Sequence, residues 1–415
     1  MKEKTINSTM ISLIVLALFF FLPFERIPTI EVFDFTLKIN HFFGIALLLS
    51  AIFVKEMRPL SINKSDIFLL LFLLYGFASI FRASDLTRAL VIWSLWLLVD
   101  LIYKVISSLK LSDEQRTKII DVILYSTLLV ALFGLYQFIA DSIGLGQSLT
   151  GLRYQYTKEI LGFPRIQSVA IEPLYFSNFL LVPFYLALKR YFDHKKFFGS
   201  YFWITFLIMI NIFLGVSRGA YIALSITIVA LIIYLIVKKD WLKIYKILLS
   251  LVLSFIASIL LIFSLNGTDA TKTYFNHIVV RDTNTEVSTT GRVEVYDDAL
   301  SIFKENPFGI GVASFGVENQ SVVDYTDIKS YGAVNNQYLE ILVEVGIIGF
   351  VLFILFFIYY ALELYPNFKR SKNKLYLILL FLGVLAIFIQ YNFFSTLYII
   401  YIWVFLGLLK NTKND

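Results

Sequence analysis

The chain alternates between long apolar runs and short polar connections over nearly its whole length. Runs of this length, close to the roughly 20 residues that cross a bilayer as a helix, predict membrane spans. Twelve of them lie near residues 8–24, 40–54, 66–81, 90–106, 119–140, 171–188, 201–216, 221–237, 245–265, 338–362, 375–392 and 395–409. The predicted fold class is therefore an all-α polytopic membrane protein with about twelve transmembrane helices, forming a single integral membrane domain over residues 1–415.

Composition supports this prediction and narrows the chemistry. Of the 415 residues, 58% are hydrophobic and only 16% are charged, and there is no cysteine, which removes disulfides, zinc thiolate sites and cysteine nucleophiles. The net charge of +6 reflects Lys and Arg residues that concentrate in the loops on the side of the N-terminus. The positive-inside rule then places both termini in the cytoplasm, and we expect no nucleic-acid partner.

This topology leaves two large loops outside the membrane, at residues 141–170 and 266–334. In the second loop, Gly291-Arg292 is expected to open an amphipathic helix, which Glu305-Asn306-Pro307 ends. Loops of this length in a compact architecture are usually functional, so we expect both to be folded and the second to be partly helical.

A polar stripe is predicted on the tenth span. If a helix starts at about Asn335, then Asn336, Glu340 and Glu344 fall at i, i+4 and i+8 on one side of it. Two carboxylates on an apolar wall need water or a cationic partner. We therefore expect a cavity or a cation beside this stripe.

Four arginines in outer loops are candidates for binding an anion: Arg153, Arg165, Arg218 and Arg292. The Arg218 guanidinium lies in a tight turn between two spans, where it can fork two phosphate oxygens or extend to lipid headgroups. In the first turn of a helix, Arg292 would oppose the helix dipole, which a bound anion would relieve. Its alternative is a pair with Glu294 or Glu340.

Acid–base chemistry has one further candidate at the start of the sixth span. Glu172 can serve as a general base if burial raises its pKa, or it can pair with Arg165. The three histidines form no metal-binding pattern, and no phosphate-binding glycine loop or nucleophile elbow is present. We therefore expect no metal and no cofactor, and a donor substrate that is already activated.

Several motifs resemble the O-antigen ligase and polymerase family (the Wzy and WaaL type). They are SRGAYIALSITIVAL from Ser217, TGRVEVYDDALSIFKENPFGIGVASFG from Thr290, NNQYLEILVEVGIIG from Asn335 and, more loosely, RIQSVAIEPLYFSNFL from Arg165. The resemblance implies a GT-C-type glycosyltransferase, inverting and metal-independent. Such an enzyme acts at the outer face of the cytoplasmic (inner) membrane on oligosaccharides linked to undecaprenyl diphosphate.

The resemblance also implies roles for individual residues. Arg165, Arg218 and Arg292 match arginines thought to hold the diphosphate; Arg153, Asn335 and Asn336 are further binding candidates, and Glu172, Glu340 and Glu344 are candidate bases. Ligases of this family carry a His-Asn pair where this chain has Asn335-Asn336, whereas Glu172-Pro173 resembles the polymerase branch. The prediction is therefore a polymerase of O-antigen, capsule or exopolysaccharide repeats, with membrane lipids, a chain-length regulator and a flippase as further partners.

Three alternatives stay open at this point. A ligase would transfer glycan from undecaprenyl diphosphate to a lipid A-core or protein acceptor. A secondary transporter or a flippase for lipid-linked glycans would also have twelve spans, but it should carry ionisable residues at mid-span, where only Asp100 comes close. A non-catalytic assembly protein would need no cluster of outer arginines.

Overall fold

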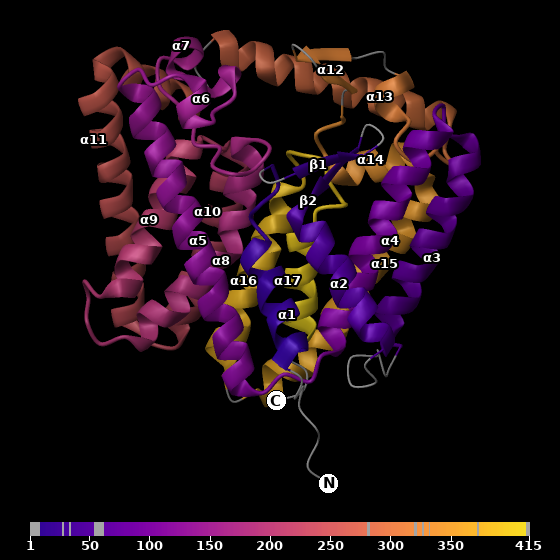
Figure 1. Ribbon diagram of the computed structural model, residues 1–415, viewed down its shortest axis with the longest axis horizontal. Coiled ribbons are helices and arrows are strands. Elements are labelled where there is room, and N and C mark those ends of the chain that lie inside the picture. The colour runs from indigo at the N-terminus through magenta and orange to yellow at the C-terminus, as the bar shows by residue number, and fades with distance from the viewer. Residues whose placement is uncertain are drawn as a thin grey trace. The chain divides into compact units, whose positions relative to one another are not determined.

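The protein is described from a computed structural model (Figure 1), which defines residues 9–26, 29–32, 35–53, 62–279, 283–318, 322–325, 328–331, 333–371 and 373–411. Its residues group into two compact units, each built from three separate stretches of the chain. Unit 1 holds Met1–Leu47, Leu111–Thr285 and Asn373–Gln390, and unit 2 holds Leu48–Lys110, Glu286–Lys372 and Tyr391–Asp415. Each unit is described by itself below.

Helices make up most of both units. Their bounds are α1 Thr9–Phe21, α2 Ile39–Phe53, α3 Lys64–Ser79, η2 Ile80–Arg82, α4 Leu86–Ser108, α5 Asp113–Ser142, α6 Gln147–Thr150, η3 Tyr154–Tyr156, α7 Lys158–Leu161, α8 Pro173–Asp193, α9 Ser200–Gly215, α10 Arg218–Val237, α11 Trp241–Val279, α12 Thr283–Glu305, α13 Phe315–Glu318, α14 Gln337–Glu344, α15 Gly346–Arg370, α16 Lys374–Gln390 and α17 Ile400–Asn411. The predicted helical class is confirmed, with two short hairpins added.

The hairpins are antiparallel. Strands β1 (Thr29–Val32) and β2 (Phe35–Lys38) form one of them, and β3 (Val322–Tyr325) and β4 (Ile328–Tyr331) form the other. All four strands carry β-branched residues, which favour extended backbone. The second hairpin lies within the predicted outer loop 266–334, which also contains α12 and α13.

Membrane-protein character is confirmed by the apolar helices. Within the described residues, six helices are long and apolar enough to cross a bilayer: Lys64–Arg82, Leu86–Ser108, Asp113–Ser142, Arg218–Val237, Trp241–Ile278 and Gly346–Arg370. Five shorter apolar helices coincide with other predicted spans. The predicted sixth span coincides with α8, whose side chains are buried nearly all round within unit 1. Twelve crossings and the GT-C architecture stay predictions.

In unit 1, α8 is the central helix and packs against α5, α9 and α16. Helix α16 approaches α8 closely at Gly383, where an added Cβ atom would lie 3.0 Å from the Cα atom of Val182. At the end of the same helix, Gln390 donates to the backbone oxygen of Leu174 and to Ser217, and accepts from Asn178. These hydrogen bonds of the Gln390 side chain hold the start of α8 next to the start of α10.

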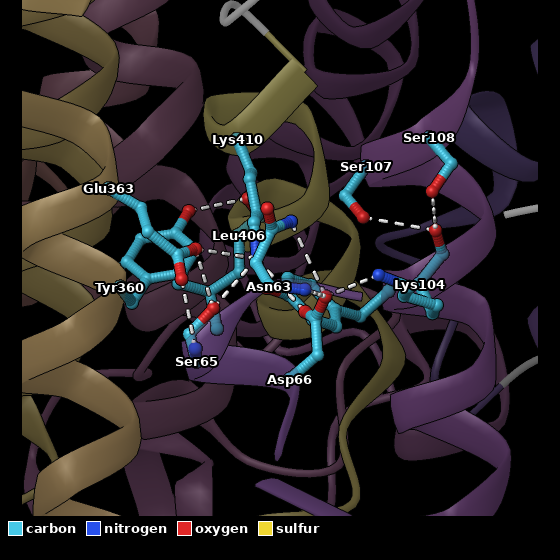
Figure 2. Close-up of polar contacts among 11 residues, drawn as sticks. Asn63, Ser65, Asp66, Lys104, Ser107, Ser108, Tyr360, Glu363, Leu406 and Lys410 are labelled. Carbon is cyan, nitrogen blue, oxygen red and sulfur yellow. Dashed lines mark hydrogen bonds and ion pairs between the residues drawn. The ribbon is translucent and has the colours of Figure 1, made fainter. Parts of the chain in front are cut away.

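In unit 2, α3 packs against α15 and α4 packs against α17. Figure 2 shows the buried polar network that joins one end of these four helices. The Lys410 ammonium, on a side chain only 4% exposed, contacts Asp66 at 2.9 Å and Glu363 at 3.0 Å, and it donates to Ser65 and Tyr103. Lys104 pairs with the other oxygen of Asp66. The ammonium groups of α17 and α4 thus meet two carboxylates, one from α3 and one from α15.

The predicted start of the tenth span is wrong. The sequence placed a single span over residues 338–362, but α14 ends at Glu344 and α15 begins at Gly346, whose φ of +85° breaks the helix. An added Cβ atom at Gly346 would lie 2.2 Å from the backbone carbon of Phe308, so the close approach of the 308–309 backbone requires glycine there. Glu340 and Glu344 therefore belong to a short helix that precedes the long apolar one.

Candidate functional site

In unit 1, the segment between α5 and α8 is held against α5 by buried polar contacts. Gln137 of α5 accepts a hydrogen bond from the Ser168 backbone at 2.6 Å and donates to its carbonyl at 3.3 Å. The Ser168 hydroxyl donates to the carbonyl of Val130. Further along, the backbone N–H groups of Arg165 and Ile166 donate to Tyr156 and Leu214. The loop that carries Arg153, Arg165 and Glu172 is therefore folded.

Glu172 precedes the first helical residue of α8, and its carboxyl does not cap that helix. Burial raises the pKa of Glu172, whereas the charges of Arg153 and Arg165 and a hydrogen bond with Tyr156 lower it. One predicted diphosphate-binding arginine, Arg165, and one further binding candidate, Arg153, therefore lie close enough to act on this carboxyl electrostatically. The structure brings these three predicted site residues together.

Arg165 has a role that the sequence did not predict. Its Nε and Nη2 atoms both donate to the carbonyl of Gly215 at 3.2 Å, and Nη2 also donates to Val216 at 3.1 Å. These carbonyls end α9, where Val216 has a φ of +47°. The guanidinium also lies over the Tyr156 ring, 5.7 Å from its centroid. Arg165 thus satisfies the end of one helix beside Glu172.

Arg218 follows this helix end by two residues. It is the first residue of α10, half-buried, and the preceding Ser217 caps the helix by accepting from the backbone of Ala220. The N-terminus of a 20-residue helix favours an anion, and a guanidinium in its first turn adds charge of the same sign. The bonds from Arg165 to Gly215 and Val216 place the Arg218 turn next to the loop that bears Glu172.

Sequence reasoning missed two members of this cluster, Arg26 and Gln167. The Arg26 backbone donates to Val169 at 2.9 Å, and its guanidinium donates to Gly151 and, at 3.4 Å, to the side-chain oxygen of Gln167. The same Gln167 oxygen accepts from the Arg153 backbone at 3.2 Å. Arg26 follows the first predicted span directly and so lies on the predicted outer side, a signal that could have identified it.

In unit 2, the glycine-rich segment after α12 is wrapped around Glu344. The carboxylate of Glu344 accepts from the backbone of Ala313 at 2.8 Å and of Phe315 at 3.1 Å, and its carbonyl accepts from Gly311 at 2.8 Å. Gly309 and Gly311 have φ values of +89° and +104°. The motif that resembled the family thus folds as a buried clamp, with both Glu344 oxygens engaged.

A cation faces this clamp, as two buried carboxylates require. Burial and the charge of Glu340 raise the pKa of Glu344 to about 8, against the two backbone donors and the charge of Arg88, which lower it. Arg88, in the first turn of α4, likewise lowers the pKa of Glu340, which burial raises. Arg88 is therefore a cation whose charge acts on both carboxyls, and sequence reasoning missed it.

Asn335 and Asn336 shape the start of α14. Asn336 caps the helix by accepting from the backbones of Tyr338 and Leu339 at 3.1 Å. Asn335 has a φ of +56° and donates to the carbonyl of Ala333. Helix capping thus accounts for Asn336 without a ligand.

The prediction for Arg292 rested on a helix start that is wrong. Helix α12 begins at Thr283, so Arg292 lies well past the first turn and does not oppose the dipole there. Residues 283–290 contain neither glycine nor proline, the two residues least compatible with a helix interior, so the helix can extend upstream of Gly291. The Arg292 side chain lies outside the described side chains. The predicted end of α12 at Glu305 is confirmed.

A comparison with protein families supports the resemblance seen in the motifs. Residues 203–354 match the family model Wzy_C, described as O-antigen ligase. The match confirms the predicted O-antigen ligase and polymerase family and does not distinguish its two branches. Over these residues the chain is similar to O-antigen ligases, and the apolar helices support its membrane character. A comparison with curated proteins gave no match.

Proposed function

We propose that this protein is a membrane glycosyltransferase that polymerises oligosaccharide repeat units linked to undecaprenyl diphosphate. The observation that carries the proposal is the cluster in unit 1, where the carboxyl of Glu172 lies within the electrostatic reach of Arg153 and Arg165. Arg165 in turn contacts the residue two positions before Arg218. A desolvated carboxyl beside several guanidinium groups suits a reaction that releases a diphosphate.

The proposed reaction is a single displacement. A hydroxyl oxygen of one lipid-linked repeat forms a bond to the anomeric carbon of another, and the bond from that carbon to the diphosphate oxygen breaks. The electron pair leaves with the diphosphate, whose developing charge Arg153 and Arg218 stabilise, and the hydroxyl proton passes to Glu172. One displacement inverts the anomeric carbon, and no metal takes part in these steps.

Glu172 is the preferred base because of what the other candidates do. Both carboxylate oxygens of Glu344 accept backbone hydrogen bonds, and Glu340 accepts one from Val334 at 3.3 Å. A carboxylate that holds the fold of a glycine-rich segment is poorly placed to change its protonation with every turnover. Arg165 acts as a positioning residue in this account, because its fork is occupied by helix carbonyls.

The same proposal includes the architecture and the location. Twelve helices would cross the cytoplasmic (inner) membrane in a GT-C-type arrangement, with both termini in the cytoplasm and the site at the outer face. Because both substrates carry lipid tails, they would enter from the bilayer. A flippase that delivers repeats and a chain-length regulator are the expected partners.

The second candidate function is ligation to a lipid A-core or protein acceptor. The family match is described as an O-antigen ligase, which favours this candidate. The Asn335-Asn336 pair argues against it, since it replaces the His-Asn pair of the ligases and since Asn336 is occupied in capping α14.

A cellular experiment separates these functions and the flippase alternative. Loss of a polymerase should leave single repeats attached to the final acceptor, loss of a ligase should leave acceptors bare while lipid-linked polymer accumulates, and loss of a flippase should abolish all repeats. We expect a deletion strain to show single repeats. Bare acceptors with accumulated polymer would overturn the proposal in favour of a ligase.

A further inference from the structure

The turn that follows α1 contributes a charged side chain to the Glu172 cluster. Its backbone is joined to the cluster by the hydrogen bond from Arg26 to Val169. The Arg26 guanidinium then reaches Gly151 on one side and Gln167 on the other. Gly151 has a φ of +67°, and an added Cβ atom would lie 3.5 Å from the Arg26 Nη2 atom.

Gln167 links Arg26 to the segment that bears Glu172. Its side-chain oxygen accepts from both Arg26 and the backbone of Arg153, and its side-chain nitrogen donates to the carbonyl of Ile171, the residue before Glu172. An uncharged amide is therefore the only hydrogen-bonding side chain that the described contacts place between the two arginines. No carboxylate is hydrogen-bonded to Arg26 in the described part of the chain.

The Arg26 guanidinium is incompletely satisfied. Its Nε atom is buried and has no hydrogen-bond partner among the described residues, whereas both terminal nitrogens donate to oxygens. Burial and then the charge of Arg153 lower the pKa of Arg26, so two like charges lie close together in a partly desolvated place. An unpaired donor on one of two neighbouring cations is an arrangement that an anion would stabilise.

The carboxylates near Arg26 do not neutralise the positive charges around it. Glu172 lies within the electrostatic reach of Arg153 and Arg165, and Arg26 within that of Arg153. The other nearby carboxyl, Glu25, is 2% exposed and lies within the electrostatic reach of buried Lys38. Among the described residues, four cations (Arg26, Arg153, Arg165 and Lys38) therefore accompany two carboxylates. A diphosphate group, which carries at least two negative charges, matches this excess.

We propose that Arg26 is a further diphosphate-binding residue of the lipid-linked substrate site, on the opposite side of Gln167 from Arg153. This inference rests on the proposed function. Arg26 would donate from Nε to a phosphate oxygen while Gly151 and Gln167 fix the plane of its guanidinium. The first helix would then take part in substrate binding through the turn that follows it.

The test is binding of undecaprenyl diphosphate to the purified full-length protein in lipid nanodiscs. We expect Arg26→Gln to weaken binding by about tenfold or more and Arg26→Lys to weaken it less. Because both variants lose hydrogen bonds to Gly151 and Gln167, thermal unfolding is measured in parallel and binding is compared well below each melting temperature. Inorganic pyrophosphate should compete with the lipid for the wild type. Arg190→Gln is the matched control. Arg190 lies at the other end of α8, where it pairs with Asp121 of α5.

The possible outcomes separate this inference from the proposed function. Unchanged binding in Arg26→Gln, together with weakened binding in Arg153→Gln, would overturn the role of Arg26 and leave the diphosphate site intact. A wild-type protein that does not bind undecaprenyl diphosphate would overturn both. If Arg26→Gln fails to fold, Arg26→Lys decides: wild-type affinity in that variant would overturn the inference, because a lysine lacks the Nε donor and the fork.

Discussion

Arg165 donates two hydrogen bonds to the single carbonyl oxygen of Gly215, both at 3.2 Å. Its guanidinium is thereby engaged by the end of helix α9. The same guanidinium lowers the pKa of Glu172 through its charge. One arginine thus sets the position of the turn before Arg218 and the electrostatics of the candidate base. A residue that resembles a substrate ligand in sequence is built into the protein as a support for two others.

Arg165→Lys is expected to lower both stability and polymerisation. A lysine keeps the charge but cannot reach Gly215 and Val216 with a rigid fork, so at least one charged hydrogen bond is lost, which corresponds to about 1.5–3 kcal/mol. Thermal unfolding in detergent measures the first effect, and polymer yield measures the second. Arg218→Lys is the comparison: it should polymerise at least about tenfold less with little change in melting temperature. Equal melting temperatures for Arg165→Lys and the wild type would contradict the helix-end role.

Glu172→Gln is expected to bind the lipid-linked substrate normally and to lose turnover at every pH. An amide cannot accept the proton, and a general base contributes about a hundredfold or more to rate. Single-turnover rates between pH 5 and 9, together with substrate affinity, measure both quantities. Near-normal turnover would remove Glu172 from the mechanism and leave the departing diphosphate as the proton acceptor.

Glu344 predicts a pH dependence of stability. Its pKa is raised to about 8 in the folded protein, from about 4.3 in an unfolded chain, so folding takes up a proton between these values. The stabilisation from the protonated carboxyl is therefore complete below about pH 4.3 and is lost as the pH rises through about 8. The melting temperature should fall from pH 5 to 8 and then level off.

The control for this prediction is Glu344→Gln, which cannot titrate. Its melting temperature should be lower overall, because the amide nitrogen cannot accept from the Ala313 or Phe315 backbone, and it should depend less on pH. A variant with the same pH profile as the wild type would show that another group is responsible.

Lys410→Met is expected to destabilise the protein strongly. The ammonium is buried and contacts both Asp66 and Glu363 (Figure 2). Its removal leaves Asp66 with Lys104 and takes the ammonium away from Glu363, which should lower the free energy of unfolding by about 3–5 kcal/mol. Lys243→Met, which removes the partly exposed pair with Asp240, should lower the free energy of unfolding by no more than about 1 kcal/mol. Unfolding in mixed micelles compares the two. Similar losses in both variants would contradict a central role for the Lys410 network.

Hydropathy predicted where the helices lie, because an apolar run of bilayer length has few alternatives to a helix. It did not predict the break at Gly346, since the residues around it are as apolar as those of a continuous span. That break depends on the approach of the Phe308 backbone, a contact made by a segment 38 positions earlier in the chain. Tertiary contacts of this kind leave no periodic signal.

The candidate site was predicted in part for a similar reason. Arg153, Arg165 and Glu172 lie within one loop, so proximity in sequence indicated proximity in space. Arg26 and Arg88 come from distant segments, and their partners Gln167 and Glu340 are apparent only in the folded chain. Side-chain roles were harder still: Arg165 and Asn336 carry polar groups suited to a ligand, but helix ends use them.

The central claim is that this protein joins lipid-linked repeat units to one another. The most direct measurement is a reaction of the purified protein with a single defined repeat unit on undecaprenyl diphosphate, without any other acceptor, followed by separation of the products by size. We predict a ladder of products that differ by one repeat, accompanied by release of undecaprenyl diphosphate. A wild-type protein that folds and binds this substrate yet forms no ladder, but transfers the repeat once when a lipid A-core acceptor is supplied, would contradict the claim.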